Sequence, residues 1–135
     1  MIDNSKLAPG VLGHAELIVR DEHTAPRIGS GRVRVLATPV MINLMEAAAL
    51  DAAENLIPDG FQSLGIHLDV RHIAATPVGM RVRASAQLIK VDGRRLDFAV
   101  EAHDEKDLIG DGLHQRIIVN VERFDARLAA KIAGR

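Results

Sequence analysis

Residues 38–56, TPVMINLMEAAALDAAENL, carry the clearest structural signal in the sequence. Thr38 and Pro39 predict a helix start, because a threonine hydroxyl can cap free backbone N–H groups and proline fits the first helical turn. Pro58, Asp59 and Gly60 predict the end of this helix. Between these signals, apolar side chains recur every three or four residues, at Met41, Leu44, Met45, Ala48, Ala52 and Leu56.

Period-two patterns flank this helix on both sides. Residues 12–20 alternate well enough for a strand. After the helix, turn signals at residues 77–79, 92–93 and 104–107 separate three or four further strands, which we expect to pair antiparallel. The predicted buried faces are Ala15, Leu17 and Val19; Leu64, Ile66, Leu68 and Val70; Val82, Ala84, Ala86 and Leu88; Leu96, Phe98 and Val100; and Ile117, Val119 and Val121.

These elements predict an α+β fold in which an antiparallel sheet wraps around one long central helix, as a single domain over residues 1–135. A loop over residues 21–31 leads into the apolar residues 33–36 and could act as a lid over a nearby site. A short terminal helix is expected over residues 125–132, stable only if it docks.

The composition excludes several classes of protein. There are no cysteines, so disulfides, thiolate metal sites and a cysteine nucleophile are excluded. A formal net charge of -1 and an aromatic content of 2% argue against nucleic-acid binding. No apolar run approaches the roughly 20 residues that span a bilayer, so we expect no membrane association and a cytoplasmic location.

Glu46 interrupts the apolar part of the predicted helix. Its helical neighbours are Ile42, Met45, Ala49 and Leu50, and no Lys or Arg lies three or four residues away. The usual surface ion pair within a helix therefore fails, and a partner must come from elsewhere in the chain. The alternative is a helix edge that simply faces solvent.

His72 is the second exception to the pattern. The parity of its strand places it toward the helix, on the same face as Leu64, Ile66, Leu68 and Val70. Alone, it would be interpreted as a core histidine bonded to a backbone carbonyl. Together with Glu46 it supports a site that activates water, in which one group removes a proton and the other stabilises charge.

Other polar residues carry weaker signals. Thr38 has a structural interpretation as the helix cap, although its hydroxyl could also serve a site. His14 and His103 fall on polar strand faces and His23 in a loop, where we expect them to be solvated. No His, Asp and Glu spacing predicts a metal triad, so we expect no metal and no cofactor.

Six segments in this order resemble the fluoroacetyl-CoA thioesterase family of hot-dog-fold proteins. The resemblance covers most of the chain from Thr38 onward, and each segment is weak without the others. The segments are ATPVMINLMEAA (residues 37–48), SLG (63–65), HIAATP (72–77), VDGRRL (91–96), AHD (102–104) and HQR (114–116).

The resemblance implies a hot-dog-fold homodimer, with active sites at the subunit interface and an acyl-CoA thioester as substrate. It places the family's catalytic threonine, glutamate and histidine on Thr38, Glu46 and His72. It also implies substrate binding by the Gly65 amide and by Arg116, donors that suit a developing oxyanion.

The expected roles leave several alternatives open. Eight residues of helix rise about 12 Å, too far for Thr38 and Glu46 to touch one atom, so either the helix starts late or the site spans subunits. Glu46 or His72 could activate water, or Thr38 could attack to form an acyl-enzyme. Residues 29–36 lack the phenylalanines of the fluoroacetyl-specialised member, so fluoroacetyl-CoA selectivity is not expected.

The predicted function is hydrolysis of a small acyl-CoA thioester. The alternatives are a non-catalytic acyl-CoA-binding or sensor module, a hot-dog hydratase and a purely structural dimer. The intact set of Thr38, Glu46 and His72 favours the thioesterase.

Overall fold

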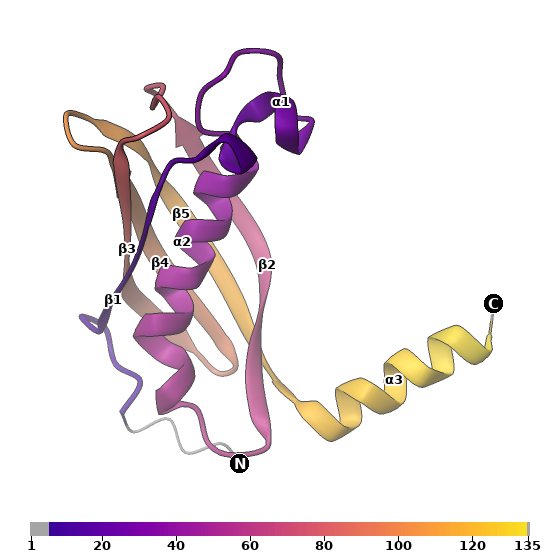
Figure 1. Cartoon of the computed structure of the whole chain (residues 1–135). Coiled ribbons are helices and arrows are strands. Elements are labelled where there is room, and N and C mark those ends of the chain that lie inside the picture. The colour runs from indigo at the N-terminus through magenta and orange to yellow at the C-terminus, as the bar shows by residue number, and fades with distance from the viewer. Residues whose placement is uncertain (1–5, 135) are drawn as a thin grey trace.

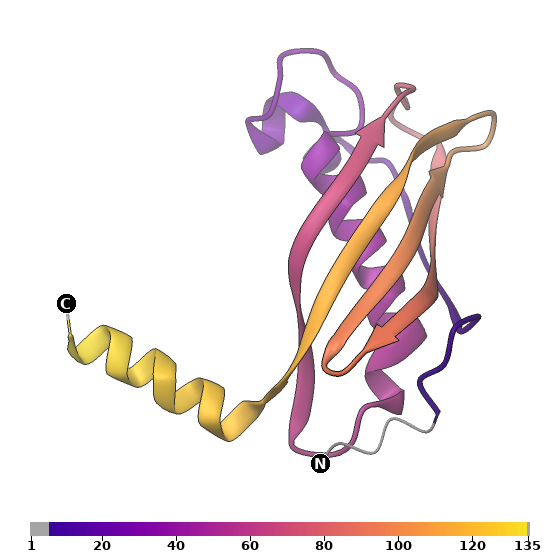
Figure 2. The same cartoon turned by 180° about the vertical axis from the view of Figure 1, so that it is seen from behind.

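The computed structural model describes residues 6–134, which form one antiparallel sheet with a long helix against it and several shorter elements. Figure 1 shows this helix in front of the sheet, and Figure 2 shows the opposite face of the sheet with the helix behind it. In chain order the elements are β1 (Leu12–Ile18), η1 (Asp21–His23), α1 (Ala25–Ile28), α2 (Thr38–Ala53), η2 (Glu54–Leu56), β2 (Phe61–His72), β3 (Arg81–Asp92), β4 (Arg95–His103), β5 (Leu108–Asn120) and α3 (Val121–Ala133).

The five strands lie in the order β1-β3-β4-β5-β2, and every neighbouring pair is antiparallel. β1 and β2 are therefore the two edges of the sheet. The core lies between the sheet and α2. This confirms the predicted α+β architecture.

The small residues of α2 let the helix lie close to β1. Ala48 and Ala52 are buried at this contact. A Cβ atom at Gly13 would lie 2.2 Å from the backbone oxygen of Ala48 and 2.3 Å from the nitrogen of Ala52. Only glycine permits this close approach, which lets the edge strand β1 pack directly against the backbone of α2.

The start of α2 differs from the prediction. Thr38 is the first helical residue and Ala37 occupies the N-cap position, so the interpretation of Thr38 as the cap is wrong. Pro39 does lie in the first turn, where its missing N–H costs no helical hydrogen bond. The Thr38 hydroxyl instead finds a partner outside the helix.

The predicted inward faces of β1, β3 and β4 are confirmed. Val19 is buried, and Ala15 and Leu17 pack against the core in partly buried positions. All the side chains predicted to be buried in β3 and β4 are at most 1% exposed: Val82, Ala84, Ala86, Leu88, Leu96, Phe98 and Val100.

The prediction for β2 is wrong for most of its apolar side chains. Leu64, Ile66 and Leu68 are 38%, 53% and 39% exposed. Leu64 pairs with Ile117 on the face away from α2, Ile66 lies at the register shift, and Leu68 lies on an edge strand. A register shift between Gly65 and His67 also adds one residue to β2 relative to β5. The extra residue reverses the alternation of faces, so Gly65 and His72 both face α2 although they are seven positions apart.

The prediction for β5 chose the wrong face. Ile118 is buried together with His114 and Arg116, whereas Ile117 and Val119 on the other face are only partly buried. The alternation of apolar residues predicted the wrong face of β5, because polar side chains such as His114 and Arg116 can be buried when they have hydrogen-bond partners. Val121, predicted to end this strand, is the first residue of α3.

α3 is longer than predicted and stands apart from the core. It starts at Val121 rather than near Asp125, and none of its residues is buried. Both views show it projecting beyond the free edge of β2 (Figures 1 and 2). Within residues 6–134, no helix is both long and apolar enough to cross a membrane.

Candidate functional site

Thr38 and His72 meet at one end of the interface between helix and sheet. Thr38 opens α2 and His72 closes β2, and Thr38 Oγ1 lies 2.7 Å from His72 Nδ1. Both residues line a cavity of about 320 Å³. The loop before α2, expected to act as a lid, supplies part of the same wall. The other lining residues are Ala25, Ser30, Val35, Leu36, Ile73, Ala74 and Ala75.

The surroundings of His72 favour its neutral form. Burial lowers the pKa of His72 below the ordinary value of 6.5, and an interaction with the Ala74 backbone opposes this shift only in part. Nε2 is buried and has no hydrogen-bond partner within residues 6–134. A neutral imidazole can accept the Thr38 hydroxyl proton at Nδ1, which is how a base activates a hydroxyl group.

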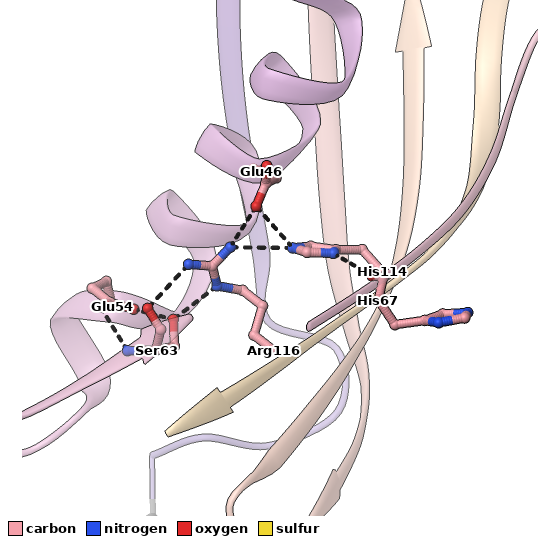
Figure 3. Close-up of polar contacts among 6 residues, drawn as sticks. All are labelled: Glu46, Glu54, Ser63, His67, His114 and Arg116. Atoms are coloured by element: carbon pink, nitrogen blue, oxygen red, sulfur yellow. Dashed lines mark hydrogen bonds and ion pairs between the residues drawn. The ribbon is translucent and has the colours of Figure 1, made fainter. Parts of the chain in front are cut away.

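Glu46 lies further along α2, and its side chain is 35% exposed. Its partner comes from a distant part of the chain, as the sequence predicted: Glu46 Oε2 accepts from Arg116 Nη1 at 3.3 Å, across a separation of 70 residues. The Arg116 side chain is 6% exposed. Figure 3 shows the carboxylate facing both Arg116 and His114. The alternative of a solvated helix edge is therefore wrong for Glu46.

Ser63 and Glu54 hold the other side of Arg116. The Ser63 Oγ accepts from Arg116 Nε at 2.8 Å and donates to Glu54 Oε1 at 2.6 Å. The Ser63 carbonyl accepts from Arg116 Nη2 at 3.1 Å, and the Ser63 N–H donates to Glu54 Oε2 at 3.0 Å. The guanidinium is thus fixed by shorter bonds to Ser63 than to Glu46 (Figure 3).

His114 is fully buried beside this guanidinium. Its Nδ1 lies 2.8 Å from the His67 carbonyl, which can only accept, so Nδ1 carries the proton and Nε2 accepts from Arg116 Nη1 at 3.2 Å. Burial lowers the pKa of His114, partly opposed by the His67 carbonyl, and the Arg116 charge lowers it further. His114 is therefore a neutral acceptor that orients Arg116.

Gly65 leaves open the space in front of Glu46. A Cβ atom there would lie 2.6 Å from Glu46 Oε2, 3.1 Å from His114 Cε1 and 3.5 Å from Arg116 Nη1. A side chain at this position would displace the carboxylate. The two residues to which the resemblance gave a substrate-binding role, Gly65 and Arg116, thus lie beside Glu46, opposite each other in the β2–β5 ladder.

One chain brings the predicted residues together as two groups rather than one. Thr38 and His72 form the first group, and Glu46, Gly65 and Arg116 form the second. α2 contains both Thr38 and Glu46 as regular helix, so their backbones are about 12 Å apart along its axis. The alternative of a late helix start is therefore wrong.

Sequence reasoning missed Glu54, Ser63 and His114 as members of the second group. His114 and Arg116 are two positions apart on one strand and so share a face, which is the signal that could have identified them. Among the described residues, no group of three or more His, Asp or Glu side chains could hold a metal ion. The absence of a metal and of a cofactor stays a prediction.

Comparisons with known proteins identify the family. A family model described as fluoroacetyl-CoA-specific thioesterase matches residues 19–122. The fluoroacetyl-CoA thioesterase of Streptantibioticus cattleyicolor is 43% identical over 97 residues, which cover 72% of this chain and 70% of that protein. A solved structure of fluoroacetyl-CoA thioesterase aligns with a TM-score of 0.86 at 35% identity, covering 92% of this chain and 96% of that one.

Two further solved structures extend the comparison. A thioesterase superfamily member from Thermus thermophilus aligns with a TM-score of 0.86 at 31% identity, covering 95% of this chain and 97% of that one. A hot-dog-like protein from Thermanaerovibrio acidaminovorans, 21% identical, aligns with a TM-score of 0.88 over 98% of this chain and 99% of its own, and bears on the fold alone. The match of the family model and the identity to the curated relative together show that this chain belongs to the fluoroacetyl-CoA-specific thioesterase family and is a thioester hydrolase with a hot-dog fold.

Proposed function

We propose that this protein hydrolyses acyl-CoA thioesters with small acyl groups, as a homodimer whose active sites lie between the subunits. The observation that carries the proposal is the 2.7 Å contact between Thr38 Oγ1 and a neutral His72, at the wall of a cavity. A base paired with a hydroxyl group is the arrangement that acyl transfer to oxygen requires. The substrate class is supported by the names of the relatives, and one solved relative is a threonine-to-serine variant bound to acetyl-CoA.

The two groups of residues supply complementary functions in this proposal. Thr38 offers a hydroxyl group and His72 a base, so this pair can activate either the Thr38 oxygen or a water molecule. Gly65 and Arg116 donate hydrogen bonds to the oxyanion that forms on the thioester carbonyl. Glu46 contacts Arg116 through a single long bond and is partly exposed, so it can reach water or substrate.

The arrangement fits two routes of hydrolysis. In one, His72 or Glu46 removes a proton from water that attacks the thioester directly. In the other, Thr38 attacks and water then resolves the acyl-enzyme. Quenching the reaction within one turnover and measuring the mass of the protein distinguishes the routes, because only the second adds the acyl group to the Thr38 peptide.

The free edge of β2 supports the dimer. β2 has 12 residues, and within residues 6–134 no strand lies beside its outer edge. Its side chains Leu64, Ile66 and Leu68 are partly exposed. Long apolar edge strands of this kind pair with another chain. We propose that two copies of β2 pair antiparallel about a twofold axis between Leu68 and Asp69.

This register follows from the separation of the two groups. An antiparallel pair centred between Leu68 and Asp69 sets His72 of the partner subunit opposite Gly65. The Thr38–His72 pair of one subunit then approaches the Glu46 group of the other. A composite site of this kind removes the difficulty that α2 keeps Thr38 and Glu46 about 12 Å apart within one chain.

The cavity wall supports a site without special preference for fluoroacetyl-CoA. Ser30, Val35 and Leu36 line it from the loop before α2, and no phenylalanine is among the described residues that line it. We therefore propose acyl groups of small size, with selectivity set by volume alone. A cytoplasmic location belongs to the same proposal, and cell fractionation tests it.

The decisive experiment mixes two inactive variants. Thiol release from a panel of acyl-CoA esters is measured for the wild type, for His72→Ala and for Glu46→Gln, and then for the two variants unfolded together and refolded. If the sites span subunits, each heterodimer contains one intact site, and about a quarter of the wild-type activity returns in a random mixture.

Each outcome decides a separate part of the proposal. Activity that stays absent in a mixture proven to contain heterodimers would refute the composite site. A monomeric wild type in analytical ultracentrifugation would refute the dimer. No thiol release from any ester by the folded wild type would refute the proposed substrate class.

A further inference from the structure

A second pocket, of about 280 Å³, lies where β5 passes into α3. Three arginines line it: Arg94 just before β4, and Arg123 and Arg127 on successive turns of α3. The remaining lining residues are Val119 and Asn120, so no acidic side chain of the described part of the chain lines the pocket. The spacing of four residues sets Arg123 and Arg127 on the same face of α3.

The three guanidinium groups carry uncompensated charge. Within residues 6–134, none of them forms an ion pair with a carboxylate, whereas the guanidinium groups of Arg27, Arg71 and Arg95 do. Among the described residues, the one interaction of an arginine head group in this pocket is that of Arg127, which lies 5.5 Å from the centre of the Phe124 ring. Three positively charged side chains that line one hollow repel one another, and an anion bound between them removes this repulsion.

The chemistry of the pocket selects phosphate. Guanidinium groups present planar pairs of N–H donors that match phosphate oxygens. A single carboxylate would neutralise one of the three charges, whereas a molecule with several phosphate groups can bind all three. The expected ligand therefore carries two or more phosphates.

The position of the pocket relates it to the proposed active site. Asn120 pairs with Phe61 and Arg116 pairs with Gly65 in the same β2–β5 ladder. Four residues of strand separate the two pairs, about 13 Å. CoA carries its thioester at one end of a long flexible arm and its phosphates at the other, so one molecule can reach both places.

An opening for that arm follows from the proposed dimer. With His72 of the partner subunit opposite Gly65, the paired part of the partner's β2 ends there. Residues 61–64 of β2 then keep a free edge, between the pocket and the thioester site. The arm can pass from one face of the sheet to the other around this edge.

We propose that Arg94, Arg123 and Arg127 form the binding site for the phosphate groups of the CoA portion of the substrate. This inference rests on the proposed function, since it assigns a second part of the same substrate. It gives α3, which has no buried residues, a role as a carrier of two phosphate-binding side chains.

The test compares two thioesters that carry the same acyl group. Acyl-CoA has the phosphates, and the acyl-pantetheine thioester has the same reactive end without them. The triple variant Arg94→Gln, Arg123→Gln, Arg127→Gln is expected to raise KM for acyl-CoA about tenfold, with kcat and all constants for acyl-pantetheine unchanged. The matched control is Arg83→Gln, which removes an exposed arginine of β3 outside this pocket and is expected to change neither.

A binding measurement separates this inference from the proposed hydrolysis. Adenosine 3′,5′-bisphosphate, titrated calorimetrically, is expected to bind the wild type and to lose most of its affinity in the triple variant. This binding measurement tests the phosphate site even if the protein hydrolyses no thioester. Equal affinity for inorganic phosphate would overturn the assignment to CoA.

Two kinetic outcomes would also overturn the inference. Equal losses with acyl-CoA and acyl-pantetheine would mean that the arginines maintain the fold. Unchanged KM for acyl-CoA in the triple variant would mean that the phosphates bind elsewhere.

Discussion

Replacing Ser63 by alanine tests whether the contacts that hold Arg116 matter for stability and catalysis. The change removes two hydrogen bonds to charged partners, from Arg116 Nε at 2.8 Å and to Glu54 Oε1 at 2.6 Å. The backbone of Ser63 keeps its own bonds to both residues. At about 1.5 kcal/mol or more for each bond to a charged group, the variant should lose about 3 kcal/mol of unfolding free energy.

The assay is urea unfolding at fixed protomer concentration, because stability of a dimer depends on concentration. The control is Ser85→Ala on β3, a partly buried serine whose side chain makes no hydrogen bond within residues 6–134. A double-mutant cycle with Glu54→Gln should be non-additive, since both changes break the same bond. A loss below about 0.5 kcal/mol for Ser63→Ala, within the range of surface substitutions, would refute the reasoning.

The same variant should also lose kcat more than it raises KM. Arg116 would be free to turn toward Glu46, and the two charges would then neutralise each other instead of serving the substrate. A variant with unchanged kcat would mean that Arg116 needs no support from Ser63.

Three further predictions concern the proposed catalytic groups. Gly65→Ala should abolish most thiol release while the protein still folds, because the new Cβ would lie 2.6 Å from Glu46 Oε2, and normal activity in a folded variant would contradict this. The pKa of His72 is lowered below 6.5, so kcat/KM should fall with decreasing pH only below pH 6.5, and the folded state should lose stability over the same range. A midpoint above pH 6.5, or the same pH profile in an active His72→Asn variant, would contradict the role of His72 as a base. The control is His103→Asn, which changes an exposed histidine. Thr38→Ser should retain activity and Thr38→Val should lose it, as measured by thiol release, since only the hydroxyl contacts His72; equal rates for the two would contradict its role.

The spacing of apolar residues along the sequence correctly predicted the elements that keep one face buried over their whole length. α2 was predicted from its apolar spacing, and the inward faces of β3 and β4 from strict alternation, because these elements lie in the middle of the core and each repeats its own period without interruption. The same logic identified Glu46 and His72, since a polar group on an apolar face must be explained by a partner. The sequence thereby also predicted that the partner of Glu46 lies outside its own helix.

Local pattern could not place the groups that depend on pairing between distant segments. The register shift near Gly65 sets Gly65 and His72 on the same face, and no period in the sequence contains that extra residue. Arg116 and His114 are buried because Glu46, Ser63 and His67 satisfy them, although hydrophobicity assigns them to solvent.

The physical reason is the range of the interactions. Helical and strand periodicity depend on residues a few positions apart, whereas the cost of burying a charge is removed only by partners that the folded chain brings together. The sequence was sufficient for the long helix, the strands and two of the proposed catalytic residues. The separation of Thr38 from Glu46 along the helix followed from the sequence. The position of His72 beside Thr38, and of Gly65 and Arg116 beside Glu46, became visible only once the helix and both strands were placed together.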